Sequence, residues 1–137
     1  MALRLVRRVK PKRSSSYSEG GKICEATHQA AFFRWLSFEL PVVRALTFAC
    51  PNGGSRNLFE AVNLKKQGVT AGLPDVVIFI PNKTYHAFLI EFKFGKNKQT
   101  EIQKNKFDLL KGQGYKCAVY YDWEQAKKEV LEYLKDV

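Results

Sequence analysis

Apolar positions along the chain recur at two spacings, and each spacing predicts a different kind of element. Apolar residues at every third or fourth position are typical of helices with one buried face, and we expect such helices at 23–38, 57–67, 100–111 and 123–135. Short apolar runs rich in β-branched and aromatic residues predict strands at 42–50, 76–80, 87–90 and 115–121. The order α-β-α-β-β-α-β-α predicts an α/β fold, with a central mixed sheet flanked by helices.

Two of the expected strands, 76–80 and 87–90, are separated by a proline-containing turn, which predicts a hairpin. Asp75 precedes the first strand, and Glu91 and Lys93 end the second. Because side chains alternate along a strand, Glu91 and Lys93 point to the same face, about 6.6 Å apart. The start of the first strand of a hairpin lies beside the end of the second. We therefore expect Asp75 to lie next to Glu91 and Lys93.

Two carboxylates and one ammonium group at the end of a sheet suit a hard divalent cation. Mg²⁺ is usually held by one or two carboxylates and keeps its other positions for water and phosphate oxygens. Such an ion lowers the pKa of a bound water and neutralises charge on a phosphate. Lys93 can orient that water, act on it as a base or contact the phosphate. Alternatively, Asp75 caps a turn while Glu91 and Lys93 lie on a solvated edge strand, but the three residues together favour the metal site.

Composition indicates one domain that is neither disulfide-linked nor membrane-spanning. The 137 residues are 45% apolar, which is enough for a single core, and no run approaches the roughly 20 apolar residues that span a bilayer. The N-terminus lacks the apolar segment of a secretory signal. Cys24, Cys50 and Cys117 are odd in number and far apart, which fits neither a disulfide framework nor a zinc site. We expect buried, reduced thiols and a cytoplasmic protein.

The net charge of +10 is concentrated at the N-terminus. Residues 1–22 carry seven basic residues against one acidic residue, a net of +6, whereas the other 115 residues carry 16 against 12, a net of +4. Positive charge attracts any polyanion without sequence preference. Gly20 and Gly21 end this stretch, so we divide the chain into a basic flexible arm at 1–22 and a folded domain at 23–137. The arm is either a solubilising segment or a nucleic-acid-binding one.

The sequence Pro74-Asp75, fifteen further residues and then Glu91-Phe92-Lys93 resembles the PD-(D/E)xK signature of the restriction-endonuclease-like nucleases. The surrounding motifs, in chain order, are Glu25 and Gln29, then Asn52-Gly53-Gly54-Ser55-Arg56, then Gly72-Leu73, and finally Gln103. Together they are similar to the virus-type replication-repair nuclease (VRR-NUC) domain in its small standalone form. The resemblance covers roughly 23–121 and implies a restriction-endonuclease-like αβββαβ core, here with one inserted helix.

The resemblance also implies roles for individual residues. Asp75 and Glu91 would hold one or two Mg²⁺ or Mn²⁺ ions, joined by Glu25, directly or through water, and by the carbonyl of Phe92. Gln103 would face the metal site, although it also stands at the capping-box position of its helix. Helical periodicity alone places Glu25 on a solvated face. Contacts with DNA phosphates are expected from Asn52, Arg56, Lys96, Lys98 and Lys104, for which an ordinary loop and a solvated lysine face are the alternatives.

We therefore expect a metal-dependent, structure-selective DNA endonuclease that hydrolyses phosphodiester bonds. Small standalone members of the resembled family act on branched DNA such as four-way junctions, some of them as dimers. The resemblance thus implies branched DNA as substrate, a homodimer, and a bacterial or phage-infected cell. Phe32, Trp35 and Phe38 are candidates for the dimer surface, although aromatic residues of a helix more often pack in the core. The alternatives are a flap- or nick-directed nuclease, a basic DNA-binding accessory protein with an inactive nuclease fold, and a ribonuclease.

Overall fold

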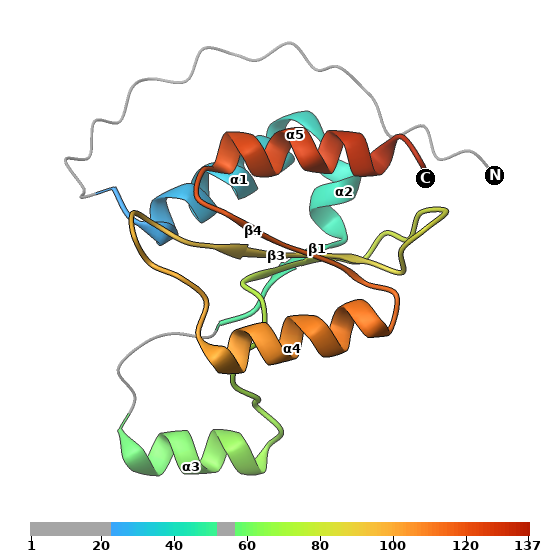
Figure 1. The fold of residues 1–137 in the computed structure, drawn as a ribbon. Helices are drawn as coiled ribbons and strands as arrows, with labels where there is room; N and C mark the ends of the chain where they lie inside the picture. Colours follow the sequence, from blue (N-terminus) through green and yellow to red (C-terminus); the bar gives the residue numbers. More distant parts are fainter. Residues whose placement is uncertain (1–22, 52–56) are drawn as a thin grey trace.

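A computed structural model describes residues 23–51 and 57–137, which form five helices and four strands (Figure 1). In chain order these elements are α1 (Glu25–Glu39), α2 (Pro41–Ala45), β1 (Thr47–Ala49), α3 (Leu58–Lys66), β2 (Val76–Ile78), β3 (Phe88–Phe92), α4 (Glu101–Gly112), β4 (Lys116–Tyr120) and α5 (Trp123–Leu134). The predicted basic arm at 1–22 lies outside the described residues.

The four strands form one mixed sheet in the order β1-β2-β3-β4. β2 pairs antiparallel with both β1 and β3, whereas β3 and β4 run parallel. A parallel pair needs a crossover connection, and α4 provides it. Helices α1, α2 and α5 lie on one side of the sheet and α4 on the other (Figure 1). The predicted α/β class, with a central mixed sheet between helices, is confirmed.

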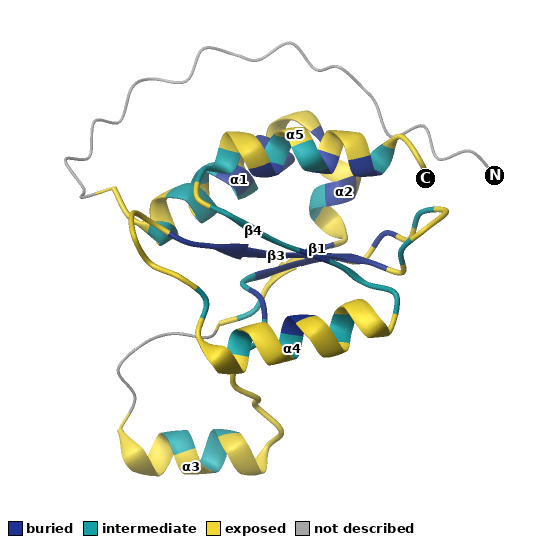
Figure 2. Cartoon of the chain, viewed as in Figure 1, coloured by how far each residue is buried: buried dark blue, intermediate teal, exposed yellow. Residues whose placement is uncertain are grey.

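Alternation along the strands produces a separate apolar cluster on each face of the sheet. Phe88 and Phe92 of β3 belong to the cluster under α1 and α5, whereas Leu89 packs in the cluster with Phe107 of α4. Figure 2 shows β3 as buried between the two helical layers, whereas β4 is mostly of intermediate burial. Glu91 lies two residues after Leu89, so its side chain points to the α4 face at the end of β3.

Helices begin where capping residues satisfy their first backbone N–H groups. The Asn57 side chain accepts a hydrogen bond from the backbone N–H of Glu60 at 2.8 Å and starts α3. Thr100 and Asp122 start α4 and α5 in the same way. The four expected helices are therefore confirmed, with boundaries that differ by at most two residues.

The expected strand at 42–50 is wrong in its first half. Residues Pro41–Ala45 form α2, and only Thr47–Ala49 form β1. Pro41 occupies the first helical turn, where the missing N–H costs nothing and the fixed φ favours a helix. Val43 is fully buried in the core cluster that includes α1 residues. Pro41 therefore marks the start of a second short helix rather than a strand.

The prediction of three buried thiols is confirmed only for Cys117. All three cysteines are free, but Cys50 is half-buried and Cys24 is exposed. Cys24 precedes the first turn of α1, where its backbone N–H donates to Thr27 Oγ1 at 3.2 Å, so its side chain lies before the part of the helix that packs on the sheet. Within the described part of the chain, no helix combines the length and apolar character needed to cross a membrane.

Candidate active site

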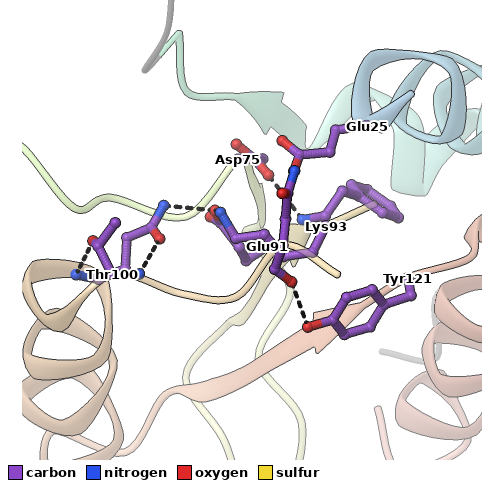
Figure 3. A network of polar contacts seen from close by, with 9 residues as sticks. Glu25, Asp75, Glu91, Lys93, Thr100 and Tyr121 are labelled. Carbon is purple, nitrogen blue, oxygen red and sulfur yellow. Dashed lines mark hydrogen bonds and ion pairs between the residues drawn. The ribbon is translucent and has the colours of Figure 1, made fainter. Parts of the chain in front are cut away.

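The β2–β3 hairpin brings Asp75 and Glu91 together at one end of the sheet. Val76 pairs with Ile90 in the antiparallel register, and continuing that register by one residue places Asp75 beside Glu91. Asp75 Oδ2 accepts a hydrogen bond from the backbone N–H of Phe92 at 2.8 Å. The carboxylate is thereby anchored to the neighbouring strand next to Glu91 (Figure 3). The predicted juxtaposition of the two acids is present.

The backbone before Asp75 is constrained on both sides. Gly72 has a φ of +80°, a conformation that residues with a side chain rarely adopt, and a Cβ added there would lie 2.8 Å from Cγ2 of Ile102 on α4. Pro74 is fully buried. The carbonyl of Asp75 accepts a hydrogen bond from the backbone N–H of Cys50 at 2.7 Å. These contacts fix the path that delivers the Asp75 side chain to the site.

Glu91 and Lys93 form a buried ion pair on the same face of the hairpin. Lys93 Nζ lies 3.0 Å from Glu91 Oε1, and the two residues are 8% and 2% exposed. Glu91 Oε2 is also buried but has no hydrogen-bond partner among the described residues. Buried carboxylate oxygens are normally satisfied. One Glu91 oxygen is therefore desolvated and free to bind a ligand.

Gln103 performs both of the roles that its sequence position suggested. Its Oε1 accepts the backbone N–H of Thr100 at 2.9 Å, which completes the capping box of α4. Its Nε2 donates to Glu91 Oε1 at 2.7 Å. The first turn of α4 therefore holds the carboxylate in place, because one amide side chain bridges the helix cap and Glu91 (Figure 3).

Glu25 reaches the site from α1 through residues that the sequence did not indicate. Asn97 Nδ2 donates to Glu25 Oε1 at 3.2 Å, and the Tyr121 hydroxyl donates to the Asn97 carbonyl at 2.8 Å. Figure 3 shows this chain of contacts next to Lys93 and Asp75. Asn97 and Tyr121 were missed because the contacts join residues 72 and 24 positions apart, and no local pattern encodes them.

Comparison with known proteins assigns the fold and the family. A model of the VRR-NUC domain matches residues 21–123, about three quarters of the chain. The chain belongs to the VRR-NUC family. A solved structure titled "VRR_NUC domain protein" shares 24% sequence identity with it, at a TM-score of 0.71, over 85% of this chain and 92% of that one. No curated protein matches the chain. The VRR-NUC domain is a nuclease domain.

In this VRR-NUC domain, burial disfavours the charged forms of the two central acids, Asp75 and Glu91. Burial raises the pKa of the Asp75 carboxyl, against the opposing effects of the Phe92 N–H and of Lys93. Burial also raises the pKa of Glu91, and the neighbouring charge of Asp75 raises it further. Both carboxylates thus carry a desolvation cost that a cation between them would offset. With the unpartnered Glu91 oxygen, this environment fits a hard divalent cation.

Glu25 is not a direct third ligand in this arrangement. Within residues 23–51 and 57–137, no group of three or more His, Cys, Asp or Glu side chains is close enough to share a metal ion. The charge of Glu25 nevertheless acts on both Asp75 and Glu91, because it contributes to the rise in the pKa of each. The carboxylate therefore lies near the two acids while bound to Asn97.

The predicted phosphate contacts are only partly covered by the structure. Lys96 and Lys98 are exposed in the loop that follows Lys93. Lys104 is exposed on α4, where its Nζ lies 3.2 Å from Glu101 Oε1. All three face solvent close in sequence to Lys93 or Gln103. Asn52 and Arg56 lie outside the described residues, so their predicted DNA contacts stay predictions.

Proposed function

We propose that this VRR-NUC domain is a Mg²⁺- or Mn²⁺-dependent endodeoxyribonuclease that hydrolyses phosphodiester bonds of branched DNA, such as four-way junctions. The observation that carries the proposal is the buried cluster at the end of the hairpin. It combines two adjoining carboxylates, a Glu91 oxygen without a partner and the Lys93 ammonium 3.0 Å from the other Glu91 oxygen.

Asp75 and Glu91 would hold the divalent cation, with the Phe92 carbonyl and, through water, Glu25. When bound, that ion supplies charge neutralisation at the phosphate and a water of lowered pKa. Lys93 would orient the attacking water from its place beside Glu91. Gln103 fixes the Glu91 carboxylate. Catalysis of this type depends mainly on positioning and on preorganised charge.

The exposed lysines near the site, Lys96, Lys98 and Lys104, would bind DNA phosphates on either side of the scissile bond. The net charge of +10 supports a polyanionic substrate. Such contacts carry no sequence information, so the substrate is recognised by its backbone path. Branched DNA suits this mode of recognition because its shape, rather than its base sequence, distinguishes it.

A homodimer would present two active sites to a symmetric junction. Of the aromatic residues predicted for its surface, Phe32 and Trp35 are 0% and 5% exposed, and both lie in the core. Phe38 is 65% exposed at the end of α1 and stays a candidate. Light scattering of the purified protein tests this part of the proposal: a strict monomer would favour a flap- or nick-directed nuclease instead.

Two charge-removing variants with matched controls test the mechanism. Asp75→Ala and Lys93→Ala should each reduce cleavage of a labelled four-way junction by at least about 100-fold in Mg²⁺ or Mn²⁺. Asp108→Ala and Lys128→Ala remove the same groups from exposed positions on α4 and α5 and should retain wild-type cleavage. Full cleavage by either site variant contradicts the mechanism. If the wild-type protein binds DNA but cuts none of the junction, flap or plasmid substrates, the accessory-protein interpretation is correct.

A further inference from the structure

Helix α3 stands apart from the sheet, beside the amino-terminal end of α4 (Figure 1). None of its nine residues is fully buried. Leu58 and Phe59 in its first turn are 82% and 78% exposed. A helix this short is marginal in water unless it packs against something. The side of α3 that faces α4, rather than Leu58 and Phe59, is the part of the helix that lines a groove.

A groove of about 290 Å³ separates α3 from the first turn of α4. Ala61 and Leu64 line it from α3, and Ile102 lines it from α4. Lys65 contributes a positive charge to the same groove, and Gln103 contributes an amide. Since Gln103 donates to Glu91 at 2.7 Å, this groove directly adjoins the proposed catalytic cluster.

Gly72 and Ile102 pack closely together in the lining of the groove. Gly72 lies so close to Ile102 that an added Cβ would come within 3.0 Å of the Ile102 carbonyl oxygen. Despite this contact, Ile102 remains 59% exposed, and Val69 on the same lining is 44% exposed. Apolar side chains that stay exposed to solvent beside a polar site, on a strongly basic domain, are typical of a ligand-binding surface.

The chemistry of the groove points to one kind of occupant. Its volume lies at the lower limit of small-molecule sites, which suits a single planar ring. Its aliphatic walls match the face of a ring, and Lys65 complements a negatively charged backbone. Its inner end meets the residues proposed to act on a phosphodiester. A nucleobase attached to the DNA strand at the site has all of these properties.

We propose that the α3–α4 groove receives one unpaired nucleobase next to the scissile phosphate. This inference rests on the proposed nuclease function and names the substrate feature that gives it structure selectivity. A paired base must leave the stack before it can enter a pocket, whereas an unpaired base at a branch or flap is already free to do so. Among branched substrates, those that carry an unpaired nucleotide at the branch should therefore be cut faster than fully paired ones.

Two tryptophan variants of α3 test the groove. Ala61→Trp fills it, whereas Val62→Trp adds a ring to the neighbouring position, which does not line the groove. Cleavage of a flap substrate in Mn²⁺ should fall about tenfold or more in Ala61→Trp and change less than about twofold in Val62→Trp. Cleavage of a fully paired, nicked duplex should be little changed in both, so the wild-type preference for flap DNA disappears only in Ala61→Trp.

A second pair of variants on α4 guards against misfolding of α3. Ile102→Ser removes one apolar wall and should weaken flap cleavage several-fold, whereas Leu109→Ser removes an equally apolar residue that is 68% exposed outside the groove. Stabilisation of each variant by Mn²⁺ in thermal melting verifies that the metal site is intact.

Three results would overturn the base-binding inference while the nuclease proposal stands. The first is equal flap cleavage by Ala61→Trp and Val62→Trp. The second is a loss of paired and unpaired cleavage together in Ala61→Trp with Mn²⁺ binding intact. The third is a change of oligomeric state in Ala61→Trp alone, which would make a second copy of the chain the occupant. A wild-type protein that cuts no DNA with either metal would instead overturn the proposed function itself.

Discussion

Replacing Gln103 by alanine removes two side-chain hydrogen bonds, one in the N-terminal cap of α4 and one to Glu91 in the candidate active site. The variant loses the bond from the Thr100 N–H at 2.9 Å and the bond to Glu91 at 2.7 Å. The helix-cap bond contributes about 1 kcal/mol to the free energy of unfolding. A hydrogen bond to a charged group contributes about 1.5–3 kcal/mol. Gln103→Ala should therefore lower the free energy of unfolding by about 2.5–4 kcal/mol.

Thr100→Ala is the matched control. It removes the side chain that accepts the Gln103 N–H at 3.2 Å and leaves the bond between Gln103 and Glu91 in place. Its cost should be about 0.5–2 kcal/mol. Gln103→Glu is a third variant, in which the new carboxylate still accepts the Thr100 N–H but repels Glu91. It should be less stable than wild type at neutral pH.

Urea denaturation, with the slope of the transition unchanged between variants, measures these differences. The free energy of unfolding should decrease in the order wild type, Thr100→Ala, Gln103→Ala. The reasoning is refuted if Gln103→Ala and Thr100→Ala are equally stable, because the bond to Glu91 would then contribute nothing. Cleavage should also fall in Gln103→Ala and not in Thr100→Ala, since only the former frees the Glu91 carboxylate.

Three further predictions concern the metal, the Glu25 network and the cysteines. Burial raises the pKa of Asp75 in the folded state, so folding disfavours its ionisation, and the stability of the metal-free protein should fall as the pH rises from the usual carboxyl pKa to the raised one. Mn²⁺ should raise the melting temperature at neutral pH, less as the pH is lowered, and not at all in Asp75→Asn. Asn97→Ala removes the hydrogen bond to Glu25 and should raise the Mn²⁺ concentration for half-maximal cleavage several-fold, with little change in the maximal rate. Tyr121→Phe, which loses the bond to the Asn97 carbonyl, should have a weaker effect of the same kind. An unchanged metal requirement in both variants would show that the position of Glu25 is irrelevant to metal binding. A hydrogen bond from Thr27 lowers the pKa of the exposed Cys24 thiol, whereas burial raises the pKa of Cys117 to about 11. Mass spectrometry after brief iodoacetamide treatment should therefore find Cys24 alkylated before Cys117. The reverse order would contradict the fold around α1.

The sequence predicts the parts of the site that depend on local pattern. The hairpin that joins Asp75 to Glu91 follows from two apolar runs and a turn, and strand alternation then places Lys93 on the same face. The capping box of α4 is equally local, which is why both roles of Gln103 could be foreseen.

Features set by tertiary packing were out of reach. Helix α2 forms because Val43 finds a place in the core, although its residues favour a strand. Glu25 lies near the two acids as expected, but the residue that binds it, Asn97, belongs to a loop 72 positions away and could not be foreseen. The absence of a hydrogen-bond partner for the buried Glu91 Oε2 among the described residues likewise has no local sequence pattern.

The two ends of the segment that carries α3 are tied down independently of the helix itself. The backbone N–H of Cys50 donates a hydrogen bond to the carbonyl of Asp75 on one side, and Gly72 packs closely against Ile102 on the other. Helix α3 (Leu58–Lys66) lies between these anchors, and none of its described residues is hydrogen-bonded to Asp75 or Glu91. We therefore expect that exchanging α3 for another segment leaves Asp75 in place, so that the groove beside α4 can change while the two acids stay together.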